Sequence, residues 1–109
     1  TYKLGLKNSL KNPNAVEKLD ASILSVEILE PILGIKDLKT DDRVYFMEGI
    51  KGVDALRNEI DLGKAQLAFG LFPVSVEQLK EIADTKSIMP PKSTWIEPKM
   101  RSGMTIYKL

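Results

Sequence analysis

The segment Ala65–Phe72 constrains the fold more than any other part of this sequence, because it is almost continuously apolar. A run of this kind is expected of a central strand that is covered on both of its faces. Pro73 follows at once, and it lacks the backbone N–H that a sheet would need from the next residue. The sequence therefore predicts a buried strand that ends at Pro73.

The spacing of apolar residues predicts a first helix that begins at Asp20, which can cap it, and that carries apolar side chains on one side as far as Leu33. Pro31 cannot donate a hydrogen bond to the carbonyl of Glu27, so the last turn must kink or end there. Gly34 suits the left-handed conformation that closes a helix.

Two more helices are expected further along the chain. One follows Gly52 and closes near Gly63, where the apolar spacing is helical. The other begins at Ser75, because Ser75 and Gln78 have the spacing of a capping box, in which each side chain bonds to the backbone N–H of the other residue.

Alternating or β-branched residues predict three further strands, at Tyr2–Leu6, Arg43–Met47 and Met104–Leu109. The elements then follow the order β-α-β-α-β-α-loop-β. This alternation favours an α/β fold, or a mixed α+β fold, in which about three helices pack on a single sheet. The length of 109 residues fits one domain, residues 1–109.

The sequence contains no cysteine and no histidine. This composition excludes disulfides, iron–sulfur clusters, cysteine nucleophiles, a histidine general base and the usual zinc sites within the chain, so we expect no metal site. Chemistry would have to use carboxylates, lysines, hydroxyls, tyrosines or backbone dipoles. No stretch approaches the roughly 20 apolar residues that span a bilayer, and no signal peptide is evident. We therefore expect a cytoplasmic protein with no membrane partner.

The formal net charge of +1 divides unevenly along the chain. Residues 86–109 have a local balance of +4, and residues 1–85 have a balance of −3. A basic end on an acidic body favours a small anionic ligand near that end, although a solvated basic end would look the same.

Residues 89–103 combine this basic charge with three prolines, which stiffen the segment and favour extended conformations before them. Six of its side chains can donate to an anion, and they form the candidate anion-binding or phosphate-binding site: Lys92, Ser93, Thr94, Lys99, Arg101 and Ser102. The hypothesis is that Lys92, Ser93, Thr94 and Lys99 converge on one anion-sized position. The alternative is purely architectural, with a stiff loop that routes the chain and with Trp95 as an anchor in the core.

The same segment resembles a known family. The residues Met89–Thr94, followed by Trp95, by Pro98-Lys99 and by Ser102-Gly103, look like the C-terminal signature of the family called domain of unknown function 1015. The segment Ile28–Ile35 is similar to a second part of that family. At Ile96-Glu97 the sequence departs from the aromatic residues expected before Pro98.

The resemblance implies a longer bacterial protein, of which this chain would be the C-terminal part, with an N-terminal domain as its partner. Family members are often labelled as similar to chromosome-partition proteins of the ParB class. The ParB and sulfiredoxin-like fold also occurs in small-molecule kinases that act on free serine. Most of any active site would then lie in the N-terminal part, and the catalytic residues cannot be assigned from this chain.

Three functions are open at this point. The chain could be the supporting domain of a phosphotransferase, whose nucleotide or pyrophosphate donor would bind with Mg²⁺ in the full-length protein, leaving this fragment inactive alone. It could be a purely structural or interaction domain that supports a catalytic partner domain, with the signature segment at the interface; the oligomeric state stays open. A nucleic-acid-binding module is less favoured, because the sequence pI is about 7.8 and no helix-turn-helix is evident. We also expect an exposed apolar patch that another part of the protein covers.

Overall fold

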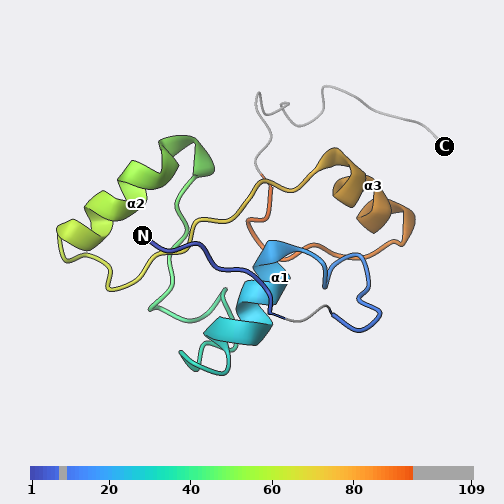
Figure 1. Cartoon of the computed structure of the whole chain (residues 1–109), viewed down its shortest axis with the longest axis horizontal. Coiled ribbons are helices and arrows are strands. Elements are labelled where there is room, and N and C mark those ends of the chain that lie inside the picture. The colour runs from blue at the N-terminus through green and yellow to red at the C-terminus, as the bar shows by residue number, and fades with distance from the viewer. Residues whose placement is uncertain (8–9, 95–109) are drawn as a thin grey trace.

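The computed structural model describes residues 1–7 and 10–94. In this part of the chain the regular structure is helical (Figure 1). The elements are α1 (Asp20–Leu24), the π-helix η1 (Ser25–Leu29), the short 3₁₀-helix η2 (Gly49–Lys51), α2 (Gly52–Asp61) and α3 (Val76–Asp84). Turns and extended segments connect them.

The helices α1 and η1 are continuous, and the chain passes from α-type to wider π-type turns at Ser25. The Ser25 hydroxyl donates to the carbonyl of Ala21 at 2.9 Å, a type of bond that often bends a helix. The predicted closing glycine is confirmed, since Gly34 has φ +67° and its N–H donates to the carbonyl of Glu30 at 3.1 Å. The predicted cap is wrong, because Asp20 is already the first helical residue and the cap position belongs to Leu19.

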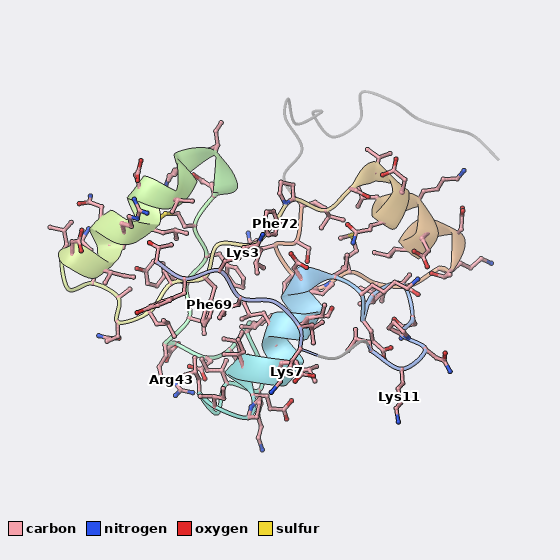
Figure 2. The ribbon with its side chains drawn as sticks, in the orientation of Figure 1. Lys3, Lys7, Lys11, Arg43, Phe69 and Phe72 are labelled. Atoms are coloured by element: carbon pink, nitrogen blue, oxygen red, sulfur yellow. The ribbon has the colours of Figure 1, made fainter. Side chains whose placement is uncertain are left out.

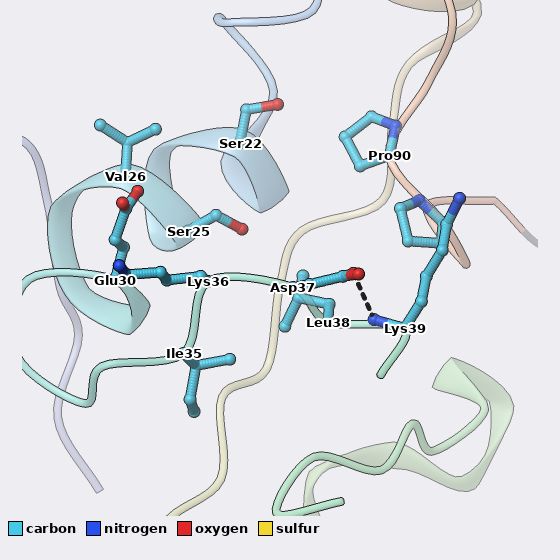
Figure 3. Close-up of a pocket in the computed structure, with 11 residues that line it drawn as sticks. Ser22, Ser25, Val26, Glu30, Ile35, Lys36, Asp37, Leu38, Lys39 and Pro90 are labelled. Atoms are coloured by element: carbon cyan, nitrogen blue, oxygen red, sulfur yellow. Dashed lines mark hydrogen bonds between the residues drawn. The ribbon is translucent and has the colours of Figure 1, made fainter. Parts of the chain in front are cut away.

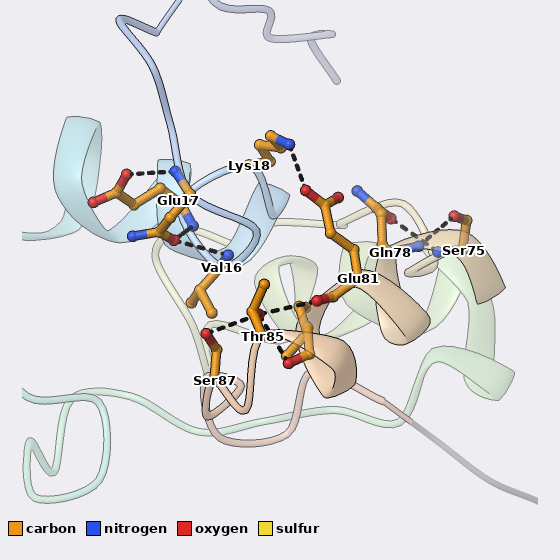
Figure 4. Close-up of polar contacts among 10 residues, drawn as sticks. Val16, Glu17, Lys18, Ser75, Gln78, Glu81, Thr85 and Ser87 are labelled. Atoms are coloured by element: carbon orange, nitrogen blue, oxygen red, sulfur yellow. Dashed lines mark hydrogen bonds and ion pairs between the residues drawn. The ribbon is translucent and has the colours of Figure 1, made fainter.

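The predicted capping box at the start of α3 is confirmed. The Ser75 hydroxyl accepts from the N–H of Gln78 at 3.2 Å, and the Gln78 side chain accepts from the N–H of Ser75 at 2.9 Å (Figure 4). These bonds satisfy two N–H groups, at the cap and in the first turn, that have no partner within the helix. Local side-chain chemistry therefore fixes where α3 begins, and it directs Ile82 on the next turns toward the core.

The core is small and lies between α3 and the turn that precedes α1. Its central cluster consists of Ala15, Leu19 and Ile82, against which Val16, Val74 and Met89 pack. Leu19 is 1% exposed and Ile82 is 3% exposed. At the edge of this contact Lys18 and Glu81 form an ion pair of 2.7 Å (Figure 4). The core thus joins segments more than 60 residues apart in the sequence.

The predicted α/β or α+β fold is wrong, because the described residues form three short α-helices and no β-strand. Ala65–Phe72 is an extended segment without a neighbouring strand, and it is not buried: Leu67, Leu71 and Phe72 are 54%, 47% and 71% exposed. Successive residues of extended chain point to opposite sides, so both sides are open to solvent. A strand requires a hydrogen-bonding partner, which apolar composition cannot supply.

Of the other three predicted strands, the structure tests two. Tyr2–Leu6 and Arg43–Met47 are also unpaired in the structure, so these predictions are wrong for the same reason. Met104–Leu109 lies outside the described residues. The three predicted helices are confirmed, since the structure has helices where the apolar spacing predicts them. They are α1 together with η1, then α2, and then α3.

The described part of the chain packs loosely, because only five of its side chains are buried. Figure 1 shows α2 standing apart from α1 and α3, joined to them by extended chain. No residue between positions 36 and 81 is buried.

The capping box gives a direct test of the local structure of α3. Ser75→Ala should lower the free energy of unfolding by about 1 kcal/mol, because it removes the acceptor for the Gln78 N–H. Thermal unfolding followed by circular dichroism measures the change. Ser22→Ala is the matched control, because the Ser22 hydroxyl makes no hydrogen bond within the described part of the chain. Equal stability of the Ser75→Ala variant and the wild type would contradict the capping role.

Candidate functional site

The predicted anion-binding segment begins with a tight turn at Pro90–Ser93. Lys92 has φ +58°, a left-handed conformation that is costly for a residue with a side chain. Proline followed by a residue of positive φ is the pattern of a type II turn, in which Gly or Asn usually takes the second place. The Ser93 hydroxyl donates to the carbonyl of Pro90 at 2.6 Å, which fastens the turn.

This turn affects what the predicted site residues can offer. The Ser93 hydroxyl hydrogen is engaged by Pro90, so in this conformation Ser93 presents lone pairs to a ligand and not a donor. Lys92 and Thr94 are exposed, and Lys92 makes no ion pair with any described residue. The positive φ does not by itself mark a site, because Lys86 has φ +51° immediately beyond the end of α3.

The other predicted site residues, Lys99, Arg101 and Ser102, lie outside the described residues. The convergence of Lys92, Ser93, Thr94 and Lys99 on one anion therefore stays a prediction. The same holds for Trp95 as a core anchor.

A shallow hollow of about 310 Å³ lies where Pro90 and Pro91 approach α1, η1 and the segment Ile35–Lys39 (Figure 3). Its lining residues are Ser22, Ser25, Val26, Glu30, Ile35, Lys36, Asp37, Leu38, Lys39, Pro90 and Pro91. The two segments that carry the family resemblance thus meet at one place. The volume is at the lower end of the range for small-molecule sites.

The charges around this hollow are balanced. Lys36 and Lys39 stand against Glu30 and Asp37, and neither lysine forms an ion pair in the described part of the chain. The Asp37 carboxylate is held locally, since it accepts from the Lys39 N–H at 2.9 Å (Figure 3) and from the Thr40 hydroxyl at 3.1 Å. The hollow therefore offers an apolar floor and single charges of both signs, without a net field that selects an anion.

Sequence reasoning missed a second polar cluster at Arg43. Its guanidinium donates to both carboxylate oxygens of Asp41, at 2.9 and 2.6 Å, and to the carbonyl of Leu33 at 3.1 Å. These bonds tie the 41–43 turn to the end of the first helix. The Asp-Asp-Arg sequence was a possible signal, but the strand predicted from Arg43 obscured it.

The hydrogen bonds that Arg43 donates hold the pKa of the Asp41 carboxyl below its ordinary value, and the same side-chain bonds raise the pKa of Arg43. Nearby, Tyr45 donates to Glu59 at 3.3 Å. Partial burial and the negative charge of Glu59 raise the pKa of Tyr45. These shifts come from a contact that holds the 41–43 turn and from one that joins Tyr45 to α2, and they do not identify a reactive pair of groups.

Within residues 1–7 and 10–94, no three acidic side chains gather where they could hold a metal ion. No helix of this part of the chain is both long enough and apolar enough to cross a bilayer.

Comparison with protein-family models, with curated proteins and with solved structures finds no match for this chain. The resemblance to the family described above accordingly stays a prediction.

The Asp41–Arg43 pair predicts a pH dependence of stability. Because the pKa of Asp41 is lower in the folded state than in the unfolded chain, the pair stabilises the fold above the unfolded pKa, about 3.9. That contribution is lost as the pH falls through the lower folded pKa. Asp41→Asn should therefore reduce the melting temperature at pH 7 and flatten its decline as the pH falls below about 4.

Asp42→Asn is the matched control for this experiment. Asp42 is the neighbouring carboxylate and forms no ion pair within the described part of the chain. If both variants show the same pH profile, the Asp41–Arg43 pair is not the source of the dependence.

Proposed function

We propose that this chain is an interaction domain that supports another polypeptide by packing an exposed apolar surface against it. The observation that carries this proposal is the position of the large apolar side chains. Sixteen of them are exposed among the described residues, and nine of these lie between Tyr45 and Phe72, where nothing is buried.

Single exposed apolar residues are normal on a protein surface, but a concentration of this kind is not. Ile50 is 74% exposed, Phe72 is 71% exposed and Val53 is 55% exposed. Figure 2 shows Phe69 and Phe72 on the extended chain that connects α2 to α3. Covering one such side chain fully is worth roughly 1.5–3 kcal/mol. Association is thus the favoured way to remove this surface from water.

The rest of the proposal concerns the longer protein that the family resemblance implies. We propose that an N-terminal part packs on this surface and that the whole is a cytoplasmic, small-molecule phosphotransferase. Exposed Lys92, which makes no ion pair in the described residues, supports a ligand contact at the Pro90–Ser93 turn. A nucleic-acid-binding role is less favoured for the surface of residues 44–72, because its three cations, Lys51, Arg57 and Lys64, all pair with nearby carboxylates.

The interaction domain can be tested with a dye that becomes fluorescent on exposed apolar surface. The purified chain should enhance the fluorescence of anilinonaphthalene sulfonate severalfold relative to a compact protein of equal mass. Replacing Ile50, Val53 and Phe72 together by serine should remove much of this signal without lowering the melting temperature, because these side chains are exposed.

Ile82→Ser is the control with the opposite signature. Ile82 is buried in the core, so its replacement should lower the melting temperature strongly. A wild-type chain that gives no more fluorescence than the compact protein would overturn the proposed interaction domain.

The ligand contact at the turn has its own test in the full-length protein. Lys92→Ala should weaken binding of pyrophosphate or of a nucleotide by about 1.5–3 kcal/mol, the usual value of a hydrogen bond to a charged group, and leave the melting temperature unchanged. Isothermal titration calorimetry measures the affinity. Lys80→Ala, at an exposed lysine of α3, is the control. Unchanged affinity in the Lys92→Ala variant would exclude Lys92 from the site.

A further inference from the structure

We infer that residues 66–72 bind their partner through the backbone, by pairing with an uncharged edge strand of the N-terminal part that the proposed function places on this surface. The inference rests on the proposed function and adds the chemistry by which the partner is recognised.

The backbone of this segment has open hydrogen-bonding groups. The N–H of Ala65 donates to the carbonyl of Glu59 at 3.2 Å, and the next backbone N–H that has a partner is that of Ser75, which bonds to the Gln78 side chain. The N–H and carbonyl groups of residues 66–74 make no hydrogen bond to any other described residue. Such groups need a partner whenever they leave water. A second extended backbone would satisfy a whole row of them at once.

The helix α2 leaves the edges of the segment free. Side chains of alternate residues in extended chain share a side, so Ala68 and Gly70 point the same way. A Cβ atom at Gly70 would lie 3.7 Å from the Leu56 side chain, so α2 lies over that side. Backbone N–H and carbonyl groups point along the plane of a sheet and not toward its faces. The packing of α2 therefore does not block a strand that lies alongside.

The composition of the segment is that of a strand with a partner. Residues 65–72 contain no charged residue, and proline comes only at position 73. Edge strands that stay in water are usually protected by charged side chains, especially lysine, or by proline within the strand. Leu67 and Leu71, on the side opposite Gly70, are 54% and 47% exposed. A strand alongside would cover part of these side chains while it pairs with the backbone.

These features specify the chemistry of the partner. The partner is an extended polypeptide segment, because only a backbone offers donors and acceptors in the order that another backbone needs. Its side chains next to Leu67 and Leu71 are uncharged, since a charge buried there would have no counter-ion in residues 65–72.

The test is hydrogen–deuterium exchange of the amides of residues 66–72, measured residue by residue in this chain alone and in the full-length protein. In this chain alone the amides should exchange as fast as those of an unstructured peptide, because none of them is bonded within the described part. In the full-length protein alternate amides should exchange on the order of a hundredfold more slowly. The amide of Leu79, which donates to the Ser75 carbonyl at 3.0 Å, is the internal reference and should be protected in both proteins.

Two adjacent proline variants separate backbone pairing from side-chain packing. Leu67→Pro and Ala68→Pro remove neighbouring N–H groups that point to opposite edges. In the full-length protein one variant should abolish the slow exchange of the remaining amides and the other should preserve it, because a single partner strand uses one edge. Ile88→Pro is the matched control and should change nothing, since Ile88 is 89% exposed and its N–H also has no partner among the described residues. Equal behaviour of the Leu67→Pro and Ala68→Pro variants would overturn the pairing.

Three other outcomes separate the inference from the proposed function. Fast exchange in a full-length protein that no longer enhances the dye fluorescence would overturn backbone pairing but leave the interaction domain standing. Slow exchange in this chain alone, increasing with its concentration, would identify a second copy as the partner and overturn the N-terminal strand. A chain that does not enhance the dye fluorescence would overturn the proposed interaction domain and this inference with it.

Discussion

The packing of Leu19 against Ile82 is the contact on which the described structure depends. It is the place where the turn before α1 and the helix α3 exclude water together, and Lys18 and Glu81 pair at its edge. An ion pair at the surface contributes at most about 1 kcal/mol to the free energy of unfolding. The burial of the apolar side chains is therefore the larger effect. The helix α2 contributes no residue to this core and is joined to it by extended chain. A core of this size thus holds α1 and α3 and leaves α2 outside.

The features that the sequence predicts correctly are local ones. The start of α3 depends on Ser75 and Gln78, three residues apart, and the end of the first helix depends on Gly34. Each of these is settled by bonds within one or two turns of chain, which the sequence displays directly. The prediction of strands is wrong because the sequence of Ala65–Phe72 shows that the segment is apolar but not whether a partner strand lies beside it. In this chain none of the described segments pairs with it.

The candidate site shows the same division. The turn at Pro90–Ser93 follows from its prolines, and the pairing of the Ser93 hydroxyl with Pro90 is local. The hollow beside it was not predictable, because it needs Pro90 to approach η1 from more than 60 residues away in the sequence. The bonds between Asp41 and Arg43 could have been predicted, because the two residues are close in the sequence. The bond from Arg43 to the Leu33 carbonyl, at the end of the preceding helix, could not. A local sequence pattern does not predict contacts between segments that are far apart in the sequence.

The position of residues 44–72 outside the core raises a question of free energy. Fixing the backbone of one residue costs about 1–2 kcal/mol, and burial of apolar side chains is the main term that offsets it. Residues 44–72 bury no side chain fully, so they gain little from the rest of the described chain. Their three exposed ion pairs, Lys51–Glu48, Arg57–Asp54 and Lys64–Glu59, contribute too little to compensate. Under the proposed function, a partner that covers the exposed apolar side chains of residues 44–72 would supply the missing burial, and docking and ordering of this part would be one event. The contact between Leu19 and Ile82 would then stabilise one cooperative unit, and association would stabilise the other.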